Sequence, residues 1–108
     1  MDVKKIKERN IRQALQASID KIFSFALGEA MSEVVYSYLR NQLELERDAI
    51  LDEPKRFADG LESLFGSGAK ILLNLIAKEL ASKIDIEYEV DQSFEEYVEK
   101  VKSSFKHK

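Results

Sequence analysis

Residues 66–84 constrain the fold of this chain more than any other stretch. Apolar side chains recur there at intervals of three and four, and further ones lie on the flank: Ala69, Ile71, Leu72, Leu73, Leu75, Ile76, Leu80 and Ile84. The apolar arc is wider than the single stripe of an ordinary surface helix. We therefore expect residues 67–84 to form the central helix of a small, mainly α-helical bundle.

Helical spacing also predicts two helices before this one, over residues 3–25 and 29–43, with Gly28 as the turn between them. The stripe of the second helix is expected to contain Met31, Val34, Val35, Tyr38 and Leu39. The two helices should pack antiparallel if the turn at Gly28 is tight. Residues 43–51 show no clear period, and we expect an irregular segment there, with Ile50 and Leu51 in the core.

Two further helix starts are marked by local chemistry. Asp52 supplies a capping acid and Pro54 falls in the first turn of a short helix that should end at Gly66, after which Ser67 is expected to cap the central helix. Ser93 and Glu96 have the spacing of a capping box, which predicts a last helix as far as about Phe105. The bundle is thus expected to have about five helices.

Residues 84–90 alternate strictly, and this pattern predicts one short amphipathic strand. Ile84, Ile86, Tyr88 and Val90 would share one face, with acidic residues on the other. Because an isolated strand leaves backbone groups unpaired, its partner would have to be residues 43–51 or a second copy of the chain.

Composition favours one globular domain spanning residues 1–108. The chain is 44% hydrophobic and 34% charged and contains no cysteine, which excludes disulfides, thiolate zinc sites and thiol nucleophiles. The first residues are charged where a signal peptide needs an apolar segment, and no apolar run reaches the roughly 20 residues of a membrane span. We expect a soluble, cytoplasmic protein without a membrane contact.

The sequence offers little for catalysis. The single histidine, His107, lies one residue from the end of the sequence, and the acidic residues between 85 and 99 lack the spacing of a calcium loop. These acids are better explained as a solvated face than as a pair that performs acid–base chemistry. We expect no catalytic residue, no metal and no cofactor, and an enzyme is the least favoured class of protein.

A glycine-rich turn at residues 66–70 raises the alternative of an anion site. Free amides at a helix N-terminus bind anions, which makes Ser67, Gly68 and Lys70 weak candidates. The spacing is not that of a P-loop, and no strand is predicted before the turn. The competing interpretation, a close corner between two helices, is favoured.

Other residues are candidates for contacts with macromolecules. Tyr36 lies off the main stripe of its predicted helix, and it joins Ile86 and Tyr88 as a possible interface residue. The remaining aromatic residues of residues 23–38 are more simply assigned to the core. Residues 4–12 are basic, but the net charge of −3 disfavours nucleic-acid binding as a function.

The sequence resembles the archaeal Nitrosopumilus output domain family. The specific segment is residues 61–70, which read Leu-Glu-Ser-Leu-Phe-Gly-Ser-Gly-Ala-Lys. Supporting segments are Ile-Arg-Gln-Ala at 11–14, Leu-Gly-Glu at 27–29, Tyr38 with Leu39, Pro54 with Phe57, and Ser-Phe-Glu-Glu-Tyr-Val at 93–98. The segment after Leu39, rich in Glu and Arg, departs from the pattern. The resemblance implies a small archaeal module associated with signal output, and it carries over no catalytic residue.

These observations favour a non-enzymatic protein-interaction or signalling-output module that acts as a homodimer, with a further protein partner as an option. The wide apolar face of residues 67–84 and the predicted unpaired strand both suggest a second copy. The alternative is a transcriptional regulator or DNA-binding accessory protein, which depends on the basic start of the chain.

Overall fold

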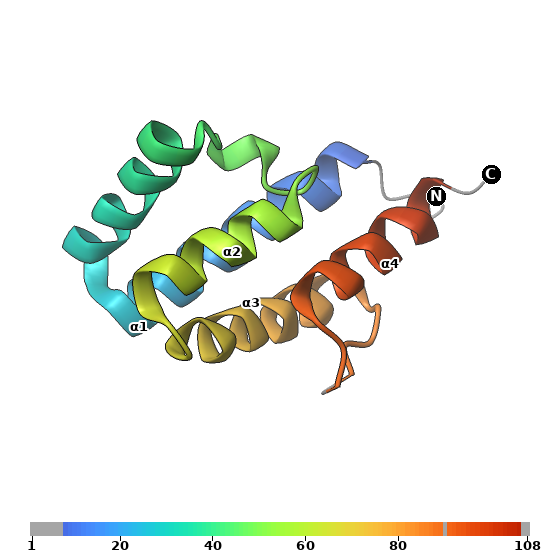
Figure 1. Cartoon of the computed structure of the whole chain (residues 1–108). Helices are drawn as coiled ribbons and strands as arrows, with labels where there is room; N and C mark the ends of the chain where they lie inside the picture. The colour runs from blue at the N-terminus through green and yellow to red at the C-terminus, as the bar shows by residue number, and fades with distance from the viewer. Residues whose placement is uncertain (1–7, 90, 107–108) are drawn as a thin grey trace.

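The computed structural model describes residues 8–89 and 91–106, and it is a bundle of α-helices (Figure 1). The helices are α1 (Glu8–Leu43), α2 (Pro54–Phe65), α3 (Gly68–Ile84) and α4 (Phe94–Lys106), with a short 3₁₀ helix, η1 (Arg47–Ala49), between α1 and α2. The expectation of a mainly α-helical fold is confirmed. The globule measures 40 × 26 × 22 Å.

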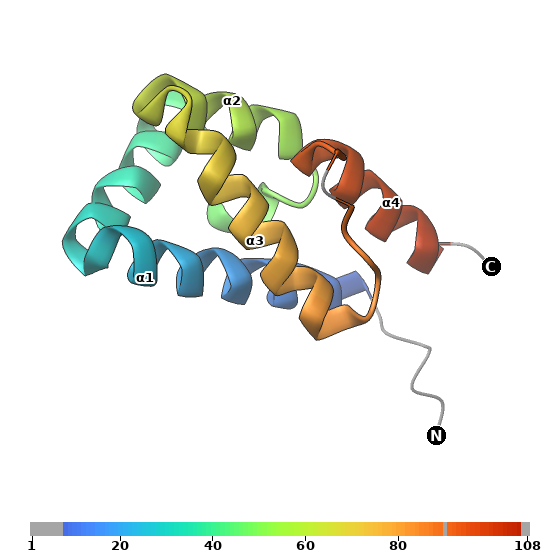
Figure 2. The ribbon, with the colours of Figure 1, turned by 90° about the horizontal axis from the view of Figure 1, so that it is seen from below.

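This part of the chain has four α-helices and not the predicted five, because the two helical segments expected before and after Gly28 follow each other directly in α1. The predicted break at Gly28 is present as a kink. Only Gly28 leaves the helical conformation within α1, with φ 84° and ψ 167°. Figure 2 shows the bend at one end of the molecule, where the segment coloured blue passes into the segment coloured teal. The glycine therefore changes the direction of the helix without inserting a loop.

Helix α3 forms where the sequence predicts it and contacts α1, α2 and α4. Each of the other three α-helices also contacts all the rest, so these contacts do not single out α3 as the central helix. Its buried residues follow the helical period and are Ala69, Leu72, Ile76, Ala77, Leu80 and Ile84. The flanking apolar residues are not all covered, and Ile71 is 64% exposed. The buried face of α3 is thus narrower than the apolar arc that its sequence presents.

Three phenylalanine rings connect the other helices through the core. The ring of Phe57 in α2 lies 6.3 Å from the ring of Phe23 in α1 and 5.6 Å from that of Phe94 in α4. Ile50 and Leu51 are each 1% exposed, as predicted for the irregular segment before α2. Aromatic rings at these separations add attraction beyond the area that they bury, so the three helices share one core.

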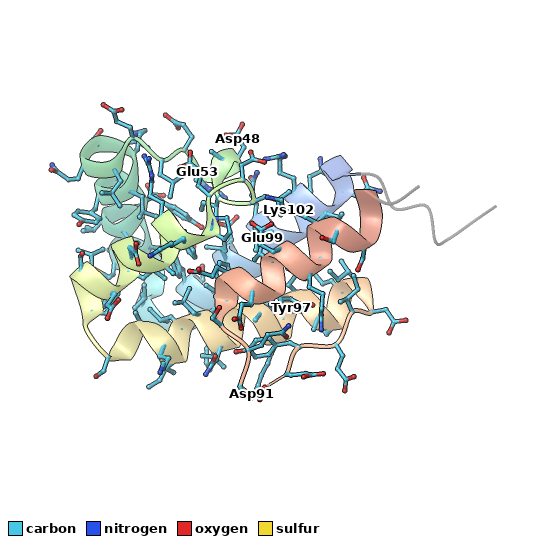
Figure 3. All side chains as sticks on the ribbon, turned by 45° about the vertical axis from the view of Figure 1, so that its right-hand side comes forward. Asp48, Glu53, Asp91, Tyr97, Glu99 and Lys102 are labelled. Atoms are coloured by element: carbon cyan, nitrogen blue, oxygen red, sulfur yellow. The ribbon has the colours of Figure 1, made fainter. Side chains whose placement is uncertain are left out.

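The predicted strand at residues 84–90 is wrong where the structure describes it: no strand occurs in residues 8–89 or 91–106. Ile84 ends α3, Asp85 takes a left-handed conformation, and the following residues are irregular. Helix α4 supplies the missing partners, because the hydroxyl of Tyr97 donates to Ile86 O at 2.5 Å and Lys100 Nζ donates to Glu87 O at 2.8 Å. Figure 3 shows Tyr97 on the side of α4 that faces this segment. Val90 lies outside the described residues.

Helix α4 begins with the predicted capping box. The amide of Glu96 donates to Ser93 Oγ at 3.1 Å, and the amide of Ser93 donates to Glu96 Oε1 at 3.0 Å. Pro54 occupies the first turn of α2, also as predicted, but Asp52 does not cap that helix. The carboxylate of Asp52 accepts instead from Arg12, at 2.8 Å. No helix in the described part of the chain has the length and apolar character needed to cross a membrane.

Candidate interaction surface at the bend of the first helix

The bend in α1 depends on a single residue. The φ and ψ of Gly28 fall in a region that is essentially restricted to glycine. A Cβ atom built on Gly28 would meet nothing within 4 Å, so the glycine is needed for its conformation and not for space. Ser32 Oγ donates to Gly28 O at 2.7 Å, which satisfies the carbonyl at the break.

A cluster of three polar and aromatic side chains, which we call the clasp, joins the two segments of α1 and η1. Tyr36, after the bend, donates its hydroxyl hydrogen to the carboxylate of Asp20, before the bend. Arg47 in η1 binds the other oxygen of Asp20 at 2.5 Å, and its guanidinium group lies 4.6 Å from the centre of the Tyr36 ring. The clasp, Asp20, Tyr36 and Arg47, therefore holds the bend on its inner side.

The surroundings of Tyr36 keep it protonated. Burial raises the pKa of Tyr36 well above its usual value, and the hydrogen bond to Asp20 raises it further. Its ring packs 5.4 Å from the ring of Phe23. Tyr36 thus acts as a hydrogen-bond donor within the fold over the whole range of pH in which proteins are ordinarily studied.

Exposed apolar side chains surround the bend. Phe25 is 81% exposed, Val34 is 55% exposed and Met31 is 44% exposed. These three residues, which we call the bend patch, lie within six positions of Gly28 on either side. They are three of the five large apolar residues that are exposed among the described residues. Aromatic and methionine side chains are enriched where proteins bind one another, so the bend patch is the best-defined candidate surface.

The sequence did not predict the bend patch. Met31 and Val34 were assigned to the buried stripe of residues 29–43, whereas the buried positions are Ser32, Val35 and Leu39. Phe25 was assigned to the core. Helical spacing limits which residues share a face, but the direction of the bend at Gly28 decides which face turns inward.

The predicted interface residues are largely engaged within the chain. Tyr36 was expected to be exposed and is partly buried in the clasp, which corrects that expectation. The hydroxyl of Tyr88 donates to the side chain of Asn74, and its ring lies 5.3 Å from the ring of Tyr97. Ile86 packs partly against the core. Ile86 and Tyr88, which follow α3 in the chain, therefore close the side of the bundle next to α4.

Two amides at the candidate anion site are already bonded within the turn. The amide of Ala69 donates to Gly66 O at 3.1 Å, and that of Lys70 donates to Ser67 O at 3.3 Å. Ser67 also makes no side-chain cap, contrary to expectation. The hollow beside the turn is lined by the carboxylate residue Glu62 together with Lys70. The favoured interpretation of Ser67, Gly68 and Lys70 as part of a helix corner agrees with this geometry.

Three other features of the sequence remain to be placed: the acidic residues, His107 and the basic start of the chain. Over residues 8–89 and 91–106, no group of three or more acidic or histidine side chains could hold a metal ion. His107 lies outside the described residues, as do residues 4–7 of the basic start. Arg12 is bound to Asp52 and, through a hydrogen bond of 2.5 Å, to Asp48 O. This arginine has a structural role at the start of α1.

Comparison of the chain with protein-family models, with curated proteins and with solved structures finds no match. The site must therefore be interpreted from its own geometry.

Proposed function

We propose that the chain is a non-enzymatic protein-interaction or signalling-output module that acts as a homodimer through the bend patch. The observation that carries this proposal is the exposure of Phe25, at 81%, together with the exposure of Met31 and Val34 near the same bend. A phenylalanine that is left in water loses the favourable free energy of burial, about 2 kcal/mol for a large apolar side chain. A contact that covers it would recover this free energy.

The charge of the molecule and the resemblance agree with this class of function. A net charge of −3 gives no general attraction to nucleic acid. The resemblance of residues 61–70 to the archaeal Nitrosopumilus output domain supports the assignment to signal output. A homodimer requires a self-complementary surface, and a compact apolar patch around a two-fold axis is the simplest form of it.

The oligomeric state tests the proposal. Phe25→Glu places a charge in the bend patch and should convert a dimer to a monomer at micromolar concentration, measured by sedimentation equilibrium. Because Phe25 is so exposed, the helical circular dichroism and the free energy of unfolding should change little. Ser103→Glu, which adds the same charge on an exposed position of α4, is the matched control and should remain dimeric.

Two results would contradict the proposal. One is a wild-type chain that is monomeric at every concentration and retains no protein from its own cell extract. The other is a dimer that Phe25→Glu leaves intact, because that result would place the interface elsewhere on the molecule.

A further inference from the structure

We propose that Gly28 is a hinge, and that the chain forms its dimer by exchanging the arm that precedes it. In this form α1 straightens, and the arm, residues 8–27, leaves α3 of its own chain. It then occupies the identical place against α3 of a second copy. The inference rests on the proposed homodimer and specifies how the two copies are joined.

Apart from the clasp, which must open, the backbone at the bend offers little resistance to straightening. Gly28 is the only non-helical residue in α1, and both neighbouring segments are helical up to it. The residues around it include Ala26, Leu27, Glu29 and Ala30, which are all good helix formers. A change of φ and ψ at one residue would thus convert two helical segments into one continuous helix.

A straight α1 cannot remain within the globule. The helix has 36 residues, so at a rise of about 1.5 Å per residue it would be about 54 Å long. The longest dimension of the molecule is only 40 Å. Straightening therefore moves the arm away from the core, together with Ile11, Leu15 and Ile19, each of which is 1% exposed in the closed form.

A second copy is the partner that fits the released arm. Three sets of polar contacts join the arm to residues after Gly28. Arg12 binds Asp52 at 2.8 Å, Asp20 binds the clasp residues Tyr36 and Arg47, and Lys21 binds Glu79 at 3.1 Å. Another copy presents the same partners in the same arrangement, so reciprocal exchange restores every one of these contacts.

The exchange also gives part of the bend patch a partner. Met31 and Val34 share one face of a continuous helix with Leu27, because the three lie at intervals of four and three; Phe25 lies off this face. In a reciprocal dimer the two straightened hinges must pass close to each other, because each arm crosses from its own chain to the other. The apolar residues on this face would then be covered between the two hinges.

The variant Gly28→Ala tests the hinge. The added methyl group meets nothing within 4 Å, so it opposes the bend only through its backbone preference. We expect light scattering to show a dimer whose molecular mass is twice that of the chain. Gly66→Ala is the matched control, because Gly66 also has a positive φ, 60°, and nothing within 4 Å of an added Cβ. It should leave the proportion of dimer unchanged.

Chemical cross-linking then shows which chain each arm contacts. The chain contains no cysteine, so Lys21→Cys with Glu79→Cys provides one specific pair for a short bismaleimide. In the closed form the cross-link lies within a chain. In Gly28→Ala it should join two chains and give a covalent dimer on a denaturing gel. Chains that carry only one cysteine each, when refolded together as a mixture, should give covalent heterodimers.

The outcome that overturns the exchange is a folded Gly28→Ala variant whose cross-links remain within single chains. If that variant does not fold, the test uses single-cysteine chains that keep the native Gly28 and are refolded together at high concentration. Covalent heterodimers would support the exchange, and their absence would overturn it. A dimer with intrachain cross-links contradicts the exchange but preserves the proposed homodimer. A wild-type chain that is always monomeric contradicts the homodimer, whatever the cross-links show.

Discussion

The hydroxyl of Tyr36 donates a hydrogen bond to the carboxylate of Asp20, and this contact joins the two segments of α1 across the bend. The acceptor is charged and also binds Arg47, so the bond belongs to the stronger class of protein hydrogen bonds. Tyr36→Phe removes the donor and leaves the ring in place. We expect it to lower the free energy of unfolding by about 1–2 kcal/mol in urea denaturation.

The same change at Tyr38 separates the hydrogen bond from a general effect of losing a tyrosine hydroxyl. Tyr38 is a partly buried residue two positions further along α1. Tyr38→Phe should cost clearly less than Tyr36→Phe. Equal free energies of unfolding for the two variants would show that the clasp does not stabilise the bend.

A close approach between α1 and α2 gives a second prediction. A Cβ atom on Gly60 would lie 2.8 Å from Leu39 Cδ2 and 2.8 Å from Leu43 Cδ1. Gly60→Ala should therefore force these leucines to move, at a cost of about 1–3 kcal/mol. The better helix propensity of alanine, worth up to about 1 kcal/mol, offsets part of that cost. We expect a net loss of stability and a lower midpoint in thermal unfolding.

Gly68→Ala is the matched control for this prediction. Its Cβ atom would lie 3.8 Å from Phe65 Cβ, which is an ordinary contact. The substitution adds helix propensity at the start of α3 without a clash, so the midpoint should stay the same or rise slightly. A midpoint of Gly60→Ala at or above that of Gly68→Ala would mean that the two leucines move without cost.

The capping box of α4 gives a third prediction. Ser93→Ala removes the acceptor for the amide of Glu96, and the loss of such a cap costs about 1 kcal/mol. Glu96→Gln keeps an acceptor for the amide of Ser93 and should cost less. The measurement is the free energy of unfolding in urea, and a Ser93→Ala variant as stable as the wild type would contradict the role of the cap.

What the sequence predicts well in this protein is local. Pro54 marks a helix start through its own backbone geometry, and Ser93 and Glu96 mark one through hydrogen bonds that span three residues, so those starts are correct. Helix α3 was also predicted correctly, because its apolar period is strong enough to be independent of its neighbours. Its capping by Ser67 was not, since the corner at Gly66 sets the conformation there.

The errors come from contacts that no local pattern contains. The alternation at residues 84–90 is real, but the carbonyl of Ile86 is bonded by Tyr97, 11 residues further on, and not by a second strand. The orientation of residues 29–43 depends on how Gly28 bends, which left Met31 and Val34 outside. The candidate surface was missed for this reason, because its exposure follows from the bend and not from the composition of either segment.

Because of Tyr97, we expect the free energy of unfolding to fall as the pH rises in the alkaline range. Burial raises the pKa of Tyr97 from 10.0 to about 12 in the folded protein, and the hydroxyl donates to Ile86 O. The unfolded chain releases this proton at lower pH than the folded chain does. The stabilisation is therefore complete below pH 10 and is lost as pH rises toward the pKa of the folded state, by about 2 kcal/mol between pH 10 and pH 12. Tyr36 and Tyr88, whose pKa values are also raised, act in the same direction.

Urea denaturation at intervals across this range of pH should show the decline in the free energy of unfolding. Tyr97→Phe should be less stable than the wild type at neutral pH, but its stability should decline less steeply. If both proteins lost stability with the same slope, the decline would have to come from the other tyrosines or from lysines, and the buried hydroxyl of Tyr97 would have no part in it.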